Sequence, residues 1–220
     1  VLHEGKLAVS FIAPLPSVGL KLWFDDSGDG ATDPAEIRTI DAATGTWIQN
    51  DLISFNGYLG LVYYTNGAGV SLKLWYDDGR GGGIAGDKRV NGTEVRAIQS
   101  NYAGARATVT SYNGRLAISF YRAYLLKLWV DDGLGGGVAG DLEVNGGEVR
   151  NVVTDFYYEP NNYHDLAVVN GKLAVSFGDG SGAIGAKVRY DHGAGGGIAA
   201  DGLVNGAEIR LVAARYDAGP

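Results

Sequence analysis

The feature that most constrains this chain is an internal repeat of about 55 residues, which occurs four times. The copies fall near residues 1–49, 50–103, 104–160 and 161–220. A unit repeated at such a period cannot cover its own apolar face, so neighbouring copies must pack on one another. The 220 residues of the chain are enough to build a sizeable core in this way.

Each copy holds four short blocks rich in Val, Ile, Leu and aromatic residues. The first block reads LAVSF at 7–11 and 173–177, LAISF at 116–120 and, more loosely, LGLVY at 59–63. The second reads LKLW at 20–23, 72–75 and 126–129, and AKVR at 186–189. The third is Glu-Ile-Arg or Glu-Val-Arg at 36–38, 94–96, 148–150 and 208–210. The fourth precedes the first, at 52–55, 108–111 and 166–169. Blocks of this length between Gly, Asn and Asp residues predict β-strands.

The turns between the fourth block and the first block predict hairpins. Asn-Gly pairs occur there at 56–57, 113–114 and 170–171, and Glu4-Gly5 takes the same place in the first copy. Asn and Gly tolerate the positive φ angles of a two-residue type I′ turn. No stretch shows sustained helical periodicity, and the 36 Gly residues oppose helix formation.

We therefore expect an all-β fold, a four-bladed β-propeller of four-stranded antiparallel blades that forms one domain over residues 1–220. The first copy lacks most of its first strand, and the tail at 215–220 runs into the place where a first strand would begin. The ends are expected to close a ring or to continue into neighbouring copies, which would remove exposed sheet edges. The sequence contains no Met, so we expect it to be a fragment of a longer chain.

These blocks resemble a broad class of bacterial β-propeller repeat proteins. In that class a strand ending in Asn-Gly or Asp-Gly is followed by strands similar to LAVSF and LKLW. The resemblance covers the whole chain and implies the propeller fold. It implies no single activity, because such propellers serve as lectins, adhesion modules, scaffolds and occasionally enzymes.

The loop after the first LKLW block has the residue spacing of a calcium loop. Acidic and hydroxyl side chains fall at positions 1, 3, 5, 9 and 12 of an EF-hand loop, with Gly30 at position 6. The loop resembles those of calcium-binding propellers and dockerin-like segments, although strands flank it here and Thr32 replaces an aliphatic residue. The predicted ligands are Asp25, Ser27, Asp29, Asp33 and Glu36.

The other three acidic loops share a different pattern, in which a run of three Gly residues separates the acidic positions. Such runs let backbone carbonyl groups turn inward as ligands, and a bound calcium ion would offset their conformational entropy. The alternative is that Asp and Asn cap tight turns by hydrogen bonds to the backbone. The predicted metal ligands are Asp77, Asp78, Asp87, Asn91 and Glu94; Asp131, Asp132, Asp141, Asn145 and Glu148; and Asp191, Asp201, Asn205 and Glu208.

The patterns of the Trp, His and paired Asp residues indicate structural roles such as packing or turn capping. The recurrence of Trp23, Trp75 and Trp129 at one strand position predicts packing between blades, with a sugar-stacking platform as the alternative. His3, His164 and His192 lack zinc-ligand spacing, and we expect them to be solvated or to cap turns. The repeated Asp-Asp pairs indicate a structural task, because an active site is normally built once.

The composition of the chain excludes several further classes of partner and chemistry. The net charge of −7 without a basic stripe argues against nucleic acid as the partner, and no apolar run is long enough to insert into a membrane. The absence of Cys excludes disulfides and thiolate chemistry. We expect a non-catalytic, extracellular or cell-surface, calcium-binding structural or adhesive module, whose partners are other copies of itself or glycans. A carbohydrate-binding lectin is the alternative, and a glycosidase or lyase on the propeller axis is the third candidate.

Overall fold

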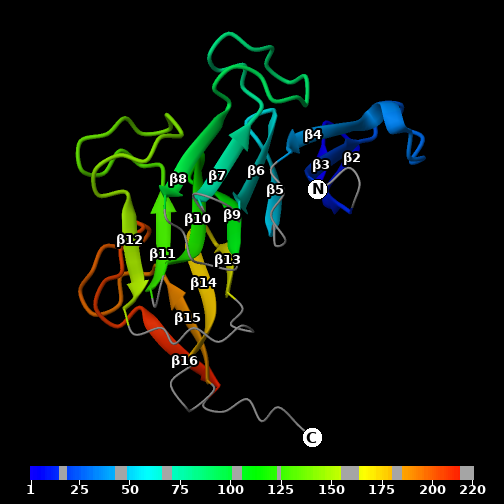
Figure 1. The fold of residues 1–220 in the computed structure, drawn as a ribbon. Helices are drawn as coiled ribbons and strands as arrows, with labels where there is room; N and C mark the ends of the chain where they lie inside the picture. Colours follow the sequence, from blue (N-terminus) through cyan, green and yellow to red (C-terminus); the bar gives the residue numbers. More distant parts are fainter. Residues whose placement is uncertain are drawn as a thin grey trace, which may run out of the picture. The chain divides into compact units, whose positions relative to one another are not determined.

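A computed structural model describes residues 1–14, 19–42, 49–65, 71–100, 106–122, 125–154, 164–179 and 185–213. These residues form sixteen β-strands and one short 3-10 helix, and none of them lies in an α-helix. The strands make four separate sheets, which follow one another along the chain from blue to red in Figure 1. Within the described residues, no helix is long and apolar enough to cross a membrane.

Each sheet has four antiparallel strands in sequence order. The first sheet contains β1 (Leu2–His3), β2 (Lys6–Ala13), β3 (Gly19–Phe24) and β4 (Ile37–Asp41), with the 3-10 helix η1 (Pro34–Glu36) before β4. The second contains β5 (Asn50–Phe55), β6 (Tyr58–Thr65), β7 (Ser71–Tyr76) and β8 (Val95–Ser100). The third contains β9 (Ala107–Tyr112), β10 (Arg115–Arg122), β11 (Leu125–Val130) and β12 (Val149–Val153). The fourth contains β13 (His164–Val169), β14 (Lys172–Asp179), β15 (Gly185–Tyr190) and β16 (Ile209–Ala213).

The predicted fold class, an all-β chain of four four-stranded antiparallel blades, is confirmed. The strand signal was local: each block pairs with the next block along the chain. The third block begins one residue later than predicted, because Glu36 belongs to η1 and Glu94 precedes β8.

The Asn-Gly pairs form the predicted two-residue turns. Asn56 and Gly57 have φ values of 48° and 80°, and they join the paired residues Phe55 and Tyr58. The turns at 113–114 and 170–171 have the same φ signs, as does the Glu4-Gly5 turn between β1 and β2. Asn tolerates this left-handed conformation because its short polar side chain can hydrogen-bond locally.

One regular feature was not predicted. In every sheet the register between the third and fourth strands shifts at the same place, just before the Lys of the second block: between Leu20 and Lys21, Leu72 and Lys73, Leu126 and Lys127, and Ala186 and Lys187. Such an irregularity increases local twist and bends the strand. It gives the outer strand of each sheet a common shape.

The chain divides into two compact units, Val1–Tyr102 and Ala103–Pro220, each built from two sheets. In the first unit Ala8, Leu20 and Leu22 of the first sheet pack with Leu59 and Leu61 of the second. In the second unit the equivalent residues Ala117, Leu126 and Leu128 pack with Leu173 and Val175. In both units, therefore, equivalent residues of the first of the two sheets pack against equivalent residues of the second. The single domain over 1–220 stays a prediction, and the tail at 215–220 lies outside the described residues.

Candidate functional site

The acidic residues that the sequence singled out lie in the loops between the third and fourth strands of each sheet. In the second sheet, Asp77 opens the loop after β7 and Glu94 closes it before β8. Both side chains are buried, with exposures of 1% and 0%. The loop therefore folds over its own carboxylates, and the partners of their oxygens determine what the loop can do.

Backbone N–H groups occupy these carboxylate oxygens. Asp77 Oδ1 accepts from Gly86 N at 3.0 Å and Oδ2 accepts from Lys88 N at 2.7 Å. Glu94 Oε1 accepts from Gly79 N at 2.8 Å, and Oε2 accepts from Asn91 N at 2.8 Å. The indole N–H of Trp75 also donates to Glu94 Oε2, at 3.4 Å. Two carboxylates thus fix four amide groups of one loop, so they replace the strand ladder where the chain leaves the sheet.

The third and fourth sheets repeat this arrangement at equivalent positions. Asp131 accepts from the N–H groups of Gly140 and Leu142 at 2.9 and 2.8 Å, and Glu148 accepts from those of Gly133 and Asn145 at 2.6 and 2.8 Å. In the fourth sheet Asp191 accepts from the N–H groups of Ala200 and Gly202, and Glu208 accepts from those of Gly193 and Asn205. The residues that donate these N–H groups differ between the loops, but they occupy the same positions in the repeat.

The Asp and Asn residues in the middle of each Gly-rich loop are joined by a hydrogen bond. Asn91 Nδ2 donates to Asp87 Oδ1 at 2.8 Å, and the pairs Asn145–Asp141 and Asn205–Asp201 do the same. The Gly runs make room for this Asn. A Cβ atom on Gly83 would lie 2.2 Å from the Cβ atom of Asn91, and Gly137 and Gly197 have the same relation to Asn145 and Asn205. The third Gly of each run is thus explained by close packing.

The second Asp of each Asp-Asp pair forms an ion pair that the sequence reasoning missed. Asp78 Oδ2 lies 2.5 Å from Arg96 Nη2, and Asp132 Oδ2 lies 2.5 Å from Arg150 Nη2. The available signal was the Arg two residues after Glu in every copy. In the fourth sheet His192 replaces this Asp, and its Nδ1 accepts from Ala194 N at 3.0 Å. His192 therefore caps the turn, as expected for that histidine.

Burial changes the acidity of these carboxyl groups. Desolvation raises the pKa of Asp77 to about 6, with smaller contributions from the negative charges of Glu94 and Asp87, while the N–H bonds from Lys88 and Gly86 oppose the shift. Desolvation likewise raises the pKa of Asp131. These shifts are those expected of carboxylates buried inside a folded loop.

The first acidic loop is shorter and more exposed than the others. Asp25 accepts from Gly28 N at 2.8 Å and from Gly30 N at 3.1 Å. Glu36 accepts from Ser27 N and from the indole N–H of Trp23, both at 3.0 Å, and these bonds hold the pKa of Glu36 below its usual range. Asp29 and Asp33 each accept a backbone N–H at Oδ1. The loop therefore links Asp25 and Glu36 through Ser27, whereas Asp29 and Asp33 accept N–H groups from residues two positions further along the chain.

In the Gly-rich loops both oxygens of each buried carboxylate receive N–H groups, so these carboxylates cap the turns of the backbone, and calcium binding there stays a prediction. Within the described residues, no group of three or more His, Asp or Glu is arranged to hold a metal ion. In the first loop Asp29 and Asp33 are exposed, and each accepts a backbone N–H group through Oδ1. For the three Gly-rich loops, the geometry supports the capping interpretation that the sequence left open.

At one equivalent position, each Gly-rich loop has an aliphatic side chain that is strongly exposed to solvent. Ile84, Val138 and Ile198 follow the Gly runs and are 69%, 67% and 71% exposed. We call these three residues the loop tips. Sequence reasoning missed them, although the recurrence of Gly-Gly-Ile-Ala and Gly-Gly-Val-Ala was visible.

The tryptophan and histidine expectations have different outcomes. Trp75 and Trp129 are fully buried and Trp23 is 7% exposed, so they offer no sugar-stacking surface, and Trp75 belongs to the core shared by the first two sheets. The expectation of solvated or capping side chains is wrong for His3 and His164, which are buried. The His164 ring stacks edge-on against Tyr121 at 4.5 Å, and its Nε2 lies 3.1 Å from the carbonyl oxygen of Ser119. The rings of Tyr121 and His164 are both buried in the second unit.

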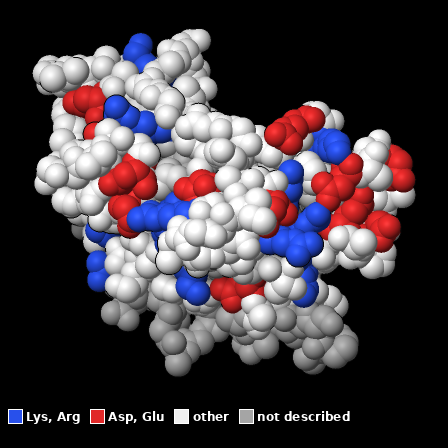
Figure 2. Space-filling view, turned by 90° about the horizontal axis from the view of Figure 1, so that it is seen from above, with Lys and Arg blue, Asp and Glu red and all other residues white. Residues whose placement is uncertain are grey.

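Charges of both signs are interspersed on the face of the molecule seen in Figure 2, where blue and red groups lie side by side. No protein-family model, no curated protein and no solved structure matches the chain.

Proposed function

We propose that this chain is a non-catalytic structural and adhesive propeller-type repeat module whose contact residues are the loop tips. The observation that carries the proposal is that the carboxylates and the aliphatic tip of each Gly-rich loop face in opposite directions. The carboxylates point inward and hold the backbone, while Ile84, Val138 and Ile198 point outward. A loop built in this way presents an apolar side chain from a fixed frame.

Exposure of a branched aliphatic side chain carries a free-energy cost in water, because burial would stabilise it by about 1.5–3 kcal/mol. A single exposed aliphatic residue needs no explanation. Three at one position of a repeat, each behind the same network of hydrogen bonds, indicate a contact point that is filled by a partner. Three weak contacts on one chain can add through multivalency.

The repetition of the loop also favours a structural role over a catalytic one. The same Asp, Asn and Glu positions bind the same backbone groups in the second, third and fourth sheets. In catalysis a carboxylate must exchange protons or contact a substrate. Here the repeated carboxylates stabilise the backbone. The extracellular location expected from the Cys-free composition belongs to this proposal.

Calcium enters the proposal only at the first loop. Asp29 and Asp33 are the residues there that could supply further oxygen ligands to an ion. Asp29→Ala should then lower the melting midpoint in calcium more than it does in a chelator. Equal effects in both conditions would remove calcium from the proposal and leave the role of the loop tips untouched.

Adsorption to an apolar surface tests the role of the loop tips. The probe is a methyl-terminated monolayer on a quartz-crystal microbalance, and the variant combines Ile84→Ser, Val138→Ser and Ile198→Ser. The matched control replaces three aliphatic residues of similar exposure outside the loops by Ser: Leu2, Leu211 and Val212. We expect the tip variant to lose most of its adsorption and the control to keep it.

Equal losses in the two variants would show that adsorption follows total apolar exposure, and the proposal would fail. A glycan array, run on the same proteins in calcium, addresses the lectin alternative. Binding of a defined glycan that survives the tip substitutions would favour a lectin over an adhesive module.

A further inference from the structure

The fourth sheet differs from the other three in one ion pair of its loop. In the first three sheets the Arg of the outer strand pairs with the second Asp of the loop: Arg38 with Asp26, Arg96 with Asp78, and Arg150 with Asp132. In the fourth sheet Arg210 occupies the same register position in β16, but His192 stands at the position of the Asp. The fourth copy therefore keeps the cation and lacks its carboxylate.

His192 takes over one of the two tasks of the Asp that it replaces. In the second sheet Asp78 Oδ1 accepts the backbone N–H group of Arg80 at 3.1 Å, and its Oδ2 binds Arg96. In the same way His192 Nδ1 accepts the N–H group of Ala194, two residues further along, at 3.0 Å. A neutral imidazole that accepts at Nδ1 carries its hydrogen on Nε2. The second nitrogen of His192 is thus a donor, whereas the second oxygen of Asp is an acceptor.

Neither of these donors has an acceptor in the described part of the chain. The Nε2 atom of His192 is buried and makes no hydrogen bond there, and Arg210 makes no hydrogen bond or ion pair with the residues that the structure describes. The two buried carboxylates of this loop, Asp191 and Glu208, lie 3.7 and 3.6 Å from Arg189, so they face a different cation. A polar group that is shielded from water without a partner destabilises the fold, which makes an acceptor at this point favourable.

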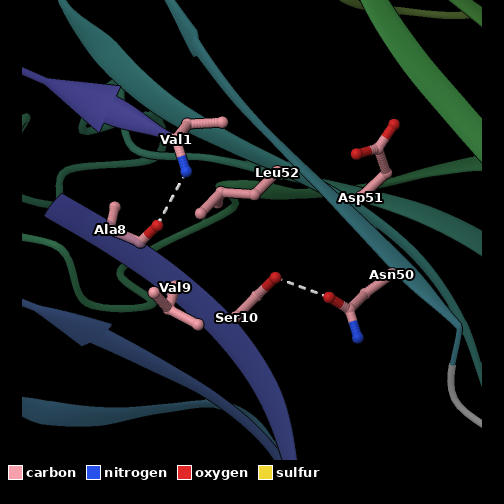
Figure 3. Close-up of a pocket in the computed structure, with 7 residues that line it drawn as sticks. All are labelled: Val1, Ala8, Val9, Ser10, Asn50, Asp51 and Leu52. Atoms are coloured by element: carbon pink, nitrogen blue, oxygen red, sulfur yellow. Dashed lines mark hydrogen bonds between the residues drawn. The ribbon is translucent and has the colours of Figure 1, made fainter.

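The cavity between β2 and β5 in the first unit provides a contrast. Its volume is about 310 Å³, and the hydroxyl group of Ser10 within it donates to Asn50 Oδ1 at 2.5 Å (Figure 3). The acceptor for that donor comes from the chain itself. For His192 Nε2 and Arg210 the described residues supply no acceptor, so a ligand can supply one.

We propose that Arg210 and His192 form a binding site for the carboxylate of an Asp or Glu side chain from a partner polypeptide. A carboxylate accepts several hydrogen bonds at once and forms charge-assisted bonds with a planar guanidinium group. It would serve Arg210 as Asp26, Asp78 and Asp132 serve the Arg residues of the other sheets. These three Asp side chains are 44%, 24% and 18% exposed, so this position of the repeat is reached by solvent. The site goes beyond the proposed function, because it contains none of the loop tips.

The occupants of the other sheets indicate the chemistry of the ligand. Each is a single planar carboxylate on a short aliphatic side chain, and such a group is what an Asp or Glu residue of another polypeptide offers. The net charge of −7 disfavours the approach of a densely acidic polymer, because the charges of like sign repel. An isolated acidic side chain is therefore a better fit than a highly charged polysaccharide.

Titration of the full chain by NMR, with the side chains of His and Arg labelled with ¹⁵N, tests the site. The probe is the peptide acetyl-Gly-Asp-Gly-amide at constant ionic strength, and the matched control is acetyl-Gly-Asn-Gly-amide, which has the same shape without the charge. We expect saturable shifts of the His192 and Arg210 side-chain signals with the Asp peptide. Half-saturation should lie in the millimolar range, because an ion pair near the surface contributes little affinity. The Asn peptide should cause no saturable shift.

Three variants make the assignment specific. His192→Asp restores the residue of the other sheets, so its carboxylate should pair with Arg210 and abolish peptide binding while the circular dichroism spectrum is kept. Arg210→Gln should weaken binding by at least about tenfold, since the charge-assisted bonds are lost. Asp78→His copies the arrangement into the second sheet and should add a second saturable set of shifts, from Arg96. Absence of saturable binding to the unmodified chain, or equal binding to His192→Asp, would overturn the inference.

Sodium glucuronate and the tip variant separate the remaining alternatives. Tighter binding of glucuronate than of the Asp peptide would overturn the polypeptide partner and favour an acidic glycan. The tip variant should bind the Asp peptide as tightly as the unmodified chain does, since its three substitutions leave both donors in place. Absence of peptide binding with intact tip-dependent adsorption would overturn the carboxylate site alone. The reverse result would overturn the adhesive function alone.

Discussion

The guanidinium group of Arg189 lies 3.6 Å from the carboxylate of Glu208, with no exposure to solvent on either side chain. The Arg occupies the position at which Trp129 donates its indole N–H to Glu148 in the third sheet. Arg189 also lies 3.7 Å from Asp191 and donates to the carbonyl oxygen of Leu203. Its Nε and Nη1 atoms have no hydrogen-bond partner in the described part of the chain. The fourth sheet thus replaces an apolar side chain by a buried cation.

Replacement of Arg189 by the residue of the other sheets should stabilise the protein. A buried ion pair is often no better than a well-packed apolar residue, so we expect Arg189→Trp to raise the free energy of unfolding by about 1–4 kcal/mol. Arg189→Ala should lower it by about 3–5 kcal/mol, because two buried carboxylates then lose their cation. Urea unfolding measures both variants. A loss of stability in Arg189→Trp as large as that in Arg189→Ala would contradict this account.

Removal of one loop carboxylate should unfold its loop. Glu148→Gln leaves one acceptor oxygen for the N–H groups of Gly133 and Asn145 and turns an amide NH₂ group toward a donor. We expect the free energy of unfolding to fall by about 2–3 kcal/mol, since a buried donor loses its charged partner. The control Glu4→Gln removes the same charge from a side chain that is 61% exposed, and it should change stability little. Similar losses in both variants would argue against an anchoring role.

Two glycines of the third loop should respond differently to Ala. A Cβ atom on Gly137 would lie 2.1 Å from that of Asn145, so Gly137→Ala must displace the Asn and should cost about 1–3 kcal/mol. A Cβ atom on Gly147 would lie 3.7 Å from its nearest neighbour, and Thr93 and Ala207 occupy the equivalent positions. Gly147→Ala should therefore be neutral or slightly stabilising. Equal melting midpoints for the two variants would refute the close-packing role of the Gly run.

The free energy of unfolding should fall in mild acid, because the imidazole of His164 binds a proton more readily in the unfolded state. Burial lowers the pKa of His164 to about 4. The unfolded imidazole binds a proton near pH 6.5, so the unfolded state takes up more protons as the pH falls from about 6.5 toward 4. This proton uptake lowers the free energy of unfolding by roughly 3 kcal/mol at the acid end of that range.

The variant His164→Asn isolates this contribution, because Asn50 occupies the equivalent position in the second sheet. The difference in unfolding free energy between the two proteins should change with pH between about 6.5 and 4. NMR titration of the His164 ring should show no protonation above about pH 5. A normal titration near pH 6.5 would show that the ring is solvated.

The sequence predicted the features that are encoded locally. The Asn-Gly pairs and the apolar blocks act within a few residues, and the hairpins that they predict are present. The burial of His3 and His164 depends on contacts with Ser54 and Ser119, far along the chain, and could not be read from their neighbours in the sequence. The register shift before each Lys and the Asp–Arg pairs also require the three-dimensional position of the fourth strand.

The acidic loops were located correctly, but the partners of their oxygens were not visible in the sequence. Asp, Asn and Glu at these spacings can surround a cation or accept N–H groups from a tight turn. The choice depends on backbone orientation. In the structure Asp77 and Glu94 accept N–H groups from Gly79, Gly86 and Lys88, as in a capped turn.

The measurement that bears most directly on this account is thermal melting of the chain and of Asp141→Ala, each with calcium and with a chelator. If the carboxylates of the Gly-rich loops serve the backbone, the shift caused by calcium will be the same in both proteins. A calcium-dependent rise in the midpoint of the unmodified chain that disappears in Asp141→Ala would place the ion in a Gly-rich loop and contradict the account.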